Sequence, residues 1–191
     1  MRKIYTLVFA LMVLLSVTMS AAALESKTIY RQNGVAAVAS WSDETPDGTT
    51  FTDLQADETN GGTDVFVFIN TPTTFKSGSI LTQEDVFEIN NKLTTATLSP
   101  VQMSLSIFNS STGEFIGEET ITIQAQWTGV GDLTKSSSKF MSKSGEFTEK
   151  FSDSSIIRDA SATGSINGQE LGISDFAELI KFKSASMTME K

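Results

Sequence analysis

The sequence predicts an all-β protein: an antiparallel sandwich or barrel of about 8–10 short strands in one domain. Three observations support this fold class. Apolar and polar residues alternate with a period of two in many segments, as the faces of half-buried strands require. Convincing helical spacing is absent from most of the chain, and Gly, Asn, Asp and Pro separate the alternating segments.

The N-terminal segment predicts export rather than a strand. Arg2 and Lys3 precede an uncharged apolar run, Ile4–Ser20, and the small residues of Ala21–Ala23 follow it. This order is typical of a Sec-type signal peptide over residues 1–23, followed by a single β-rich domain over 24–191. The run is shorter than the ~20 residues that span a bilayer. We therefore expect a secreted or cell-surface protein, with membrane attachment only where the signal stays uncleaved.

In the first half of the exported chain, turn residues separate three predicted strands, Val35–Trp41, Thr50–Ala56 and Asp64–Ile69. The last of these is apolar on both faces, so we expect it to be a central strand covered on both sides. Residues 71–91 are ambiguous. Either a short helix follows Thr82, or Val86–Ile89 forms a further strand.

The second half returns to alternation over residues 97–107, where Pro100 predicts a bulge or a break at an edge. The remaining predicted strands are Glu118–Thr128, Lys135–Lys143, Gly145–Asp153 and Ser155–Ile166, with a closing strand around 185–189. Asn167-Gly168 predicts a tight turn. The spacing of the apolar residues in Ser174–Lys181 favours one or two helical turns.

Two stretches of the second half carry a resemblance. Residues 127–131 read W-T-G-V-G and residues 158–164 read R-D-A-S-A-T-G. Together they resemble the W-T-G-x-G and R-x-A-x-A-x-G motifs of a family of uncharacterised secreted prokaryotic β-proteins. The resemblance implies export and a β fold. It implies no catalytic residue, because that family has no assigned activity.

The second motif also has a physical interpretation. Alternation places Arg158 on one strand face with Ala160, Ala162 and Gly164, where small side chains leave room for a bulky group. We expect Arg158 to lie near Trp127 or Trp41 and to pair with an acid, since a partly buried guanidinium needs a partner. A ligand-binding role for Arg158 is the alternative.

The two tryptophans, Trp41 and Trp127, end the apolar faces of two predicted strands. They are either core anchors between β layers or exposed platforms that stack on sugars, and core anchors are the commoner case. Both therefore join Arg158 as structural or ligand-facing candidates.

Composition excludes several chemistries. The chain has no Cys and no His, which rules out a thiol nucleophile, thiolate or imidazole metal ligands and a Ser-His-Asp triad. The formal net charge is −9, and without Arg2 and Lys3 the remaining 12 basic and 23 acidic residues give −11. Nucleic acid is therefore not an expected partner. The partner classes that the sequence leaves open are a cell-surface glycan and a cell-surface protein.

Three weaker signals concern ligands and modification. Asp43-x-Thr45-x-Asp47-Gly48 resembles the start of a calcium loop but lacks the acid of the twelfth position, so weak calcium binding is the most that it predicts and no cofactor is expected. Glu114, Glu118 and Glu119 are the candidates for carboxylate catalysis. Asn109-Ser110-Ser111 fits a glycosylation sequon in a turn.

The sequence thus favours a non-enzymatic binding or cell-envelope-associated module. A barrel-type carrier of a small apolar ligand is the first alternative, and it requires an internal cavity. A carboxylate-based glycan hydrolase is the second, and it requires two acids that face each other across a cleft.

Overall fold

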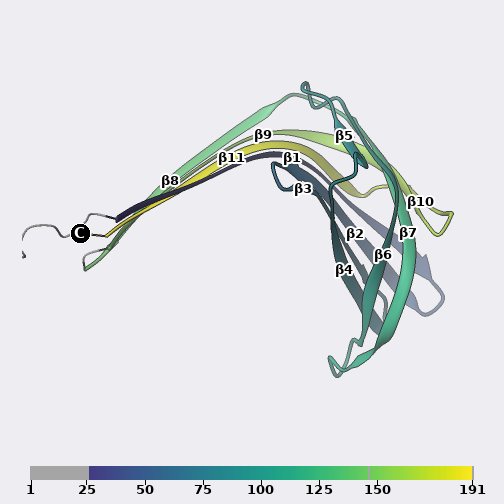
Figure 1. Cartoon of the computed structure of the whole chain (residues 1–191). Helices are drawn as coiled ribbons and strands as arrows, with labels where there is room; N and C mark the ends of the chain where they lie inside the picture. The colour runs from purple at the N-terminus through teal and green to yellow at the C-terminus, as the bar shows by residue number, and fades with distance from the viewer. Residues whose placement is uncertain (1–25, 146, 191) are drawn as a thin grey trace, which may run out of the picture. The chain divides into compact units, whose positions relative to one another are not determined.

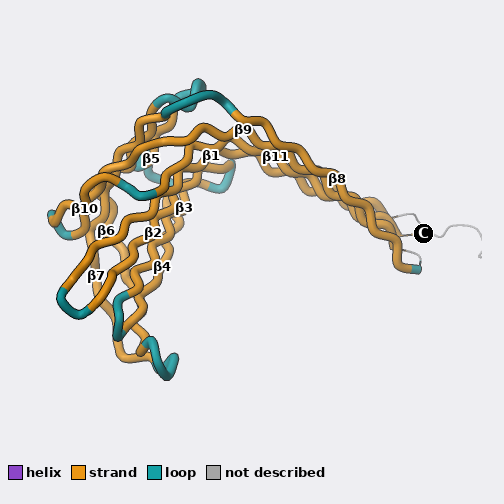
Figure 2. Tube along the Cα trace, turned by 180° about the vertical axis from the view of Figure 1, so that it is seen from behind, coloured by secondary structure: helices purple, strands orange, loops and turns teal. Residues whose placement is uncertain are grey.

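The structure is a computed structural model that describes residues 26–145 and 147–190. The predicted signal peptide, residues 1–23, lies outside the described residues. Within them the chain is all-β, and the tube in Figure 2 shows strands joined by short loops with no helix. The described part of the chain therefore contains no helix of the length and apolar character that crossing a membrane requires.

The described residues form eleven strands. Their bounds are β1 Ser26–Thr45, β2 Gly48–Thr59, β3 Gly62–Asn70, β4 Thr74–Thr82, β5 Phe87–Ile89, β6 Thr95–Asn109, β7 Phe115–Gly129, β8 Thr134–Ser144, β9 Phe147–Ile166, β10 Gln169–Ile173 and β11 Phe176–Glu190. The predicted all-β antiparallel class is confirmed. The expectation of uniformly short strands is wrong, because β1 and β9 each have 20 residues.

The sheet closes on itself. Along the chain β1 pairs with β2, β2 with β3, β3 with β4 and β4 with β6. Strand β6 pairs with β7, β7 with β9, and β9 continues through β11 back to β1 (Figure 1). In the described chain three strands lie outside this ring. Strand β5 pairs with β6, and both β8 and β10 pair with β9. Closure leaves the ring strands without free edges.

The chain divides into two compact units. The larger unit comprises residues 31–138 and 152–185, and it contains the ring pairings of β1 to β7 and the β7–β9 pairing. The described part of the smaller unit comprises residues 26–30, 139–145, 147–151 and 186–190. Its strands carry several exposed apolar side chains, Ile29, Tyr30, Phe140, Met141, Phe147 and Phe151.

The core of the larger unit follows directly from the alternation. On β7 the residues Ile121, Ile123, Ala125 and Trp127 are buried, whereas the residues between them are exposed. Several ring strands turn such rows inward, and the rows join in a single cluster that includes Ala37, Ala39, Trp41, Leu54, Val65, Val67, Leu98, Met103, Leu105 and Leu179. Burial of these rows on one face fixes the pairing register, because a slip by one residue would expose them all.

Two local predictions hold in detail. The pairing of β6 with β7 shifts register between Leu98 and Val101, so Pro100 does mark a bulge. Asn167-Gly168 forms the tight β9–β10 turn, with φ of 52° at Asn167 and 81° at Gly168. Asn tolerates a positive φ better than most residues, and Gly has no Cβ to prevent it.

Two other predictions are wrong. Residues 174–181 form no helical turn, since β11 begins at Phe176 and buries alternate residues, Ala177 and Leu179. The apparent helical spacing depended on Ile173 and Phe176, which are 74% and 50% exposed. Strand β3 is covered on one face only, because Val65 and Val67 are buried while Phe66 is 40% exposed. In the ambiguous segment the strand alternative is the right one, as Phe87–Ile89 pairs with β6.

Candidate functional site

Both tryptophans are core anchors. Trp127 is 1% exposed, donates its indole N–H to the Val38 carbonyl over 2.9 Å and meets Phe87 edge-on at a ring-centroid distance of 6.3 Å. Trp41 is 3% exposed, and its indole nitrogen has no hydrogen-bond partner among the described residues. Exposed sugar platforms at these positions are therefore excluded.

The small residues of β9 face these tryptophans. Ala162 lies opposite Trp127 in the β7–β9 ladder, and Trp41 Cζ2 lies 3.4 Å from where a Cβ would stand at Gly164. The bulky groups for which the small residues leave room are thus the two indoles. The R-x-A-x-A-x-G stretch has a packing role at these positions.

Arg158 lies at the end of the same row, against Gly129. Its Cδ lies 2.6 Å from the position that a Cβ would occupy at Gly129, and the Leu93 carbonyl oxygen lies 2.4 Å from that same position. A glycine at 129 therefore allows β7, the Arg158 stem and the loop before β6 to meet. The structure thus places the Arg158 stem against Gly129, two residues after Trp127 on β7, and its proximity to either indole stays a prediction.

The expected acid partner of Arg158 is not seen. Its Nε is buried and has no hydrogen-bond partner, and the ion pair that residues 26–145 and 147–190 do contain joins Lys76 to Glu119. The neighbouring acid on β9, Asp159, is exposed because alternation turns it to the other face. The structure thus leaves the buried Nε of Arg158 without a hydrogen-bond partner among the described residues.

The loop between β5 and β6 covers this end. Leu93 is 2% exposed and has a positive φ of 54°, so the loop inserts a leucine into the core. Asn90 holds the loop in place: its Oδ1 accepts a hydrogen bond from the Thr94 amide over 2.8 Å, and its Nδ2 donates to the Thr95 hydroxyl over 2.8 Å. The interior at this end is consequently filled by Leu93 rather than open.

A hollow of about 630 Å³ lies beside this loop, wholly within the larger unit. We call it the basic hollow, because three lysines and no carboxylate are among the described residues that line it. Its volume falls within the range of small-molecule sites, about 300–1,000 Å³. It is lined by Asn91, Lys135, Ser136, Ser137, Ser154, Ser155, Ile156, Lys181 and Lys183.

Two smaller hollows also lie on the larger unit. One of about 280 Å³ shares Lys181 and Lys183 with the basic hollow and adds Glu58, Gly34 and Phe182. The other, of about 360 Å³, lies on the outer face of β6, β7 and β9 beside the Pro100 bulge. Its polar lining includes Thr97, Ser99, Gln124, Gln126, Thr163, Ser165 and Glu170. We call this second one the outer groove.

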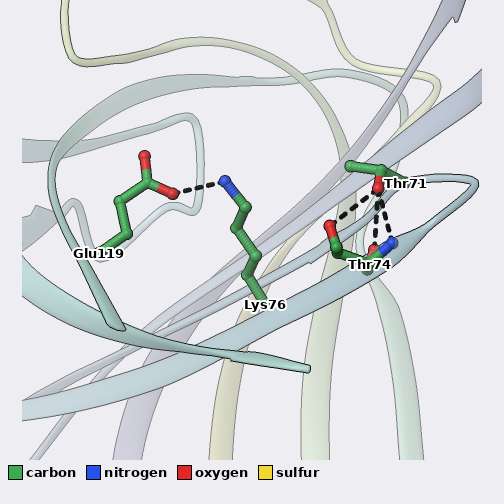
Figure 3. A network of polar contacts seen from close by, with 4 residues as sticks. All are labelled: Thr71, Thr74, Lys76 and Glu119. Atoms are coloured by element: carbon green, nitrogen blue, oxygen red, sulfur yellow. Dashed lines mark hydrogen bonds and ion pairs between the residues drawn. The ribbon is translucent and has the colours of Figure 1, made fainter. Parts of the chain in front are cut away.

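At the opposite end of β7 the candidate catalytic acids do not form a pair. Glu119 bonds to Lys76 of β4, and Figure 3 shows these two side chains pointing toward each other, near the Thr71–Thr74 turn. Glu118 alternates with Glu119 and lies exposed on the other face. Glu118 and Glu119 therefore do not face each other across a cleft, as glycan hydrolysis by a pair of carboxylates would require.

A row of phenylalanines crosses the outer surface of β3, β4, β6 and β7. Phe75 stacks on Phe108 at a centroid distance of 4.9 Å, Phe68 lies 6.2 Å from Phe75, and Phe115 meets Phe108 edge-on at 5.7 Å. Stacked rings turn their faces toward each other, so this row packs the sheet rather than offering a flat sugar platform.

The acidic residues of the described chain form pairs rather than clusters that could bind a metal ion. The described residues contain no group of three or more Asp or Glu side chains placed to hold a metal ion. Asp57 and Asp64 are cross-strand partners on β2 and β3. Burial raises the pKa of Asp57, the Gln55 amide bonded to it lowers that pKa, and the charge of Asp64 raises it.

Asn109 lies at the end of β6. Its Oδ1 accepts hydrogen bonds from the Ser111 amide over 2.9 Å and the Thr112 amide over 3.1 Å, which orders the β6–β7 turn. Glycosylation at this position stays a prediction.

Comparison with models of protein families, with curated proteins and with solved structures found no match. The case for a function therefore rests on the geometry. Sequence reasoning singles out Arg158 but misses the three lysines of the basic hollow, because Lys135 and the pair Lys181 and Lys183 come from segments far apart in the chain. The available signal was modest: Lys181 and Lys183 share the inward parity of Ala177 and Leu179, where a lysine is unusual.

Proposed function

We propose that this protein is an exported, non-enzymatic binding module that acts outside the cell or at its surface and takes its ligand in the basic hollow. The observation that carries the proposal is the hollow itself, about 630 Å³ and lined by three lysines with no carboxylate, in a chain of net charge −9. Such a local reversal of charge is typical of a binding site rather than of a surface selected for solubility.

The filled ring interior favours this proposal over an apolar carrier. Two indoles and the inserted Leu93 are among the buried side chains that occupy the interior of the larger unit. A carrier needs instead a cavity large enough to enclose most of its ligand. The separation of Glu118 from Glu119 on opposite faces of β7 argues in the same way against the glycan hydrolase.

The test fills the hollow with a large side chain. The protein is produced from its full reading frame and mixed with the envelope fraction of the cells that make it. We expect saturable binding that Ser137→Trp or Ser155→Trp weakens about tenfold or more, as the loss of a well-packed contact region does. Ser99→Trp, in the outer groove, is the matched control and should bind like the parent protein.

Circular dichroism and melting curves exclude misfolding as the cause of lost binding. The proposal fails if both hollow variants fold and bind like the parent protein. It also fails if mass spectrometry of an organic extract reveals a stoichiometric apolar ligand, which would identify a carrier. Turnover of a glycan that disappears on Glu→Gln substitution would identify a hydrolase.

A further inference from the structure

Resting on the proposed function, we infer that the ligand of the basic hollow is an oxyanion: a molecule or polymer segment that carries at least two phosphate or carboxylate groups. The inference concerns the chemical class of the ligand, whereas the proposed function concerns only the place of binding. The lysines and the hydroxyl groups around them each contribute to it.

The lysines supply the charge. Lys135 comes from β8, and Lys181 and Lys183 come from β11, so three ammonium groups surround one hollow. Glu58 lines the adjoining hollow together with the two lysines of β11, and it forms no ion pair with them in the described chain. Like charges held together repel, and a bound anion removes that repulsion while gaining charge-assisted hydrogen bonds.

The neutral polar residues match the same ligand. Ser136, Ser137, Ser154 and Ser155 bring four hydroxyl groups, and Asn91 brings an amide. Each of these groups donates hydrogen bonds, and phosphate and carboxylate oxygens only accept them. The number of donors exceeds what a single small anion with one charged group would use, which favours a ligand with two or more.

Arg158 lies near the hollow along the chain but is not among the described residues that line it. Ile156, two residues earlier on β9, lines the hollow, and so does Asn91, two residues before the Leu93 that shares the Gly129 contact with Arg158. The Arg158 Nε is buried without a partner in the described structure. The inference about the ligand therefore rests on the lysines and the hydroxyl groups, and Arg158 has a packing role at the edge of this region.

The hollow does not favour nucleic acid among phosphate-bearing ligands. In the part of the chain that the structure describes, no aromatic side chain lines it, so a base would find no ring to stack on. The net charge of −9 also opposes the approach of a long duplex, whose phosphates extend far beyond a single hollow. A short polyanion, or one segment of an envelope polymer, meets neither obstacle.

The experiment measures binding of inorganic tripolyphosphate, of citrate and of long-chain polyphosphate by isothermal titration calorimetry, with neutral dextran as the uncharged comparison. One variant of the protein, which we call the hollow variant, carries Lys135→Gln, Lys181→Gln and Lys183→Gln together. A matched variant carries Lys139→Gln, Lys143→Gln and Lys150→Gln, which are exposed lysines of the smaller unit. Both variants lower the net charge by the same amount, so only the position of the change differs.

We expect the parent protein and the matched variant to bind at least one of the three anions and the hollow variant to bind it about tenfold or more weakly, since each lost ion pair with a partly desolvated anion has a cost. Binding should weaken on going from about 20 mM to about 300 mM salt. Tighter binding of tripolyphosphate than of the long chain would indicate a free small ligand, and the reverse would indicate a polymer.

The inference is overturned if the parent protein binds none of the three anions, or if both lysine variants bind them equally. It is also overturned if Ser137→Trp abolishes envelope binding while the lysine variant retains it at all salt concentrations. That last result would leave the proposed function standing with a neutral ligand. The inference would fail in favour of nucleic acid if single-stranded DNA competed with tripolyphosphate more strongly than polyphosphate did.

Discussion

The Arg158 side chain packs directly over Gly129: its Cδ stands 2.6 Å from where a Cβ would be at that glycine. The contact joins β9 to the end of β7, and the Leu93 carbonyl completes it from the loop that covers this end of the ring. One glycine thus allows both the Arg158 stem and the loop that inserts Leu93 to approach the end of β7. Substitutions of Gly129 and of Arg158 test this junction.

Gly129→Ala should destabilise the fold by about 1–3 kcal/mol, as overpacking of a close contact does. The new methyl group would meet the Leu93 carbonyl at 2.4 Å, and that backbone atom is less able to move aside than the Arg158 stem is. Gly117→Ala is the control on the same strand, because no atom lies within 4 Å of its would-be Cβ. Urea unfolding measures both, and equal midpoints would refute the close packing.

Arg158→Met should be tolerated better than Arg158→Ala. The methionine keeps a stem that covers Gly129, and it removes a buried Nε that has no partner. The alanine variant loses the packing as well, at a cost of about 2 kcal/mol. Thermal melts and urea titrations compare the two. If both variants unfold at the same denaturant concentration as the parent protein, Arg158 does not pack at this junction.

The two tryptophans should respond differently to the same substitution. Trp127→Phe loses the hydrogen bond to the Val38 carbonyl, whereas Trp41→Phe removes an indole nitrogen that has no partner among the described residues. Both lose a similar amount of buried ring, so the Trp127 variant should be less stable than the Trp41 variant by about 1 kcal/mol. The difference between the two urea midpoints measures this, and the opposite order would contradict the hydrogen-bond assignment.

Asp57 should make stability depend on pH. Burial is the main reason that its pKa lies above the ordinary value of 3.8, and the like negative charge of Asp64 also raises it. A carboxyl whose pKa is higher in the folded state contributes stability below the unfolded pKa, and that contribution is lost as pH rises through the folded pKa. Asp57→Asn should therefore be more stable than the parent protein at neutral pH, and its advantage should vanish below 3.8.

The control for Asp57 is Asp132→Asn, which changes an exposed carboxylate in the loop before β8. It should show no such pH-dependent difference from the parent protein. An Asp57→Asn variant that gains stability only as the pH falls would reverse the sign and refute the account. Urea unfolding over a series of pH values provides the measurement.

Much of the fold was predictable because the signals were local. Alternation identified the inward rows of β1 and β7, Pro100 identified the bulge in β6, and Asn167-Gly168 identified the β9–β10 turn. Each of these depends on residues within a few positions of one another. The same local reasoning failed for residues 174–181, where a coincidental spacing of apolar residues imitated a helix. Closure of the ring through β11 decides that segment, and closure is a property of the whole sheet.

The candidate site was less predictable, because it depends on contacts between distant segments. Arg158 was found from its place in a row of small residues, but an acid partner was expected where the structure gives Gly129 and Leu93. The lysines of the hollow come from β8 and β11, and nothing local in the sequence links them. Sequence patterns show which side chains face inward, but not which of them meet at the end of a ring.

The most direct test of the central claim is a titration of ¹⁵N-labelled protein with inorganic tripolyphosphate, followed by amide chemical shifts. We predict saturable shifts concentrated at Asn91 and in the segments 135–137, 154–156 and 181–183. Amides of the outer groove, such as those of Thr97, Gln126 and Thr163, should stay in place. Shifts centred on the outer groove or on the buried interior, or no saturable shifts at all, would contradict binding of an oxyanion in the basic hollow.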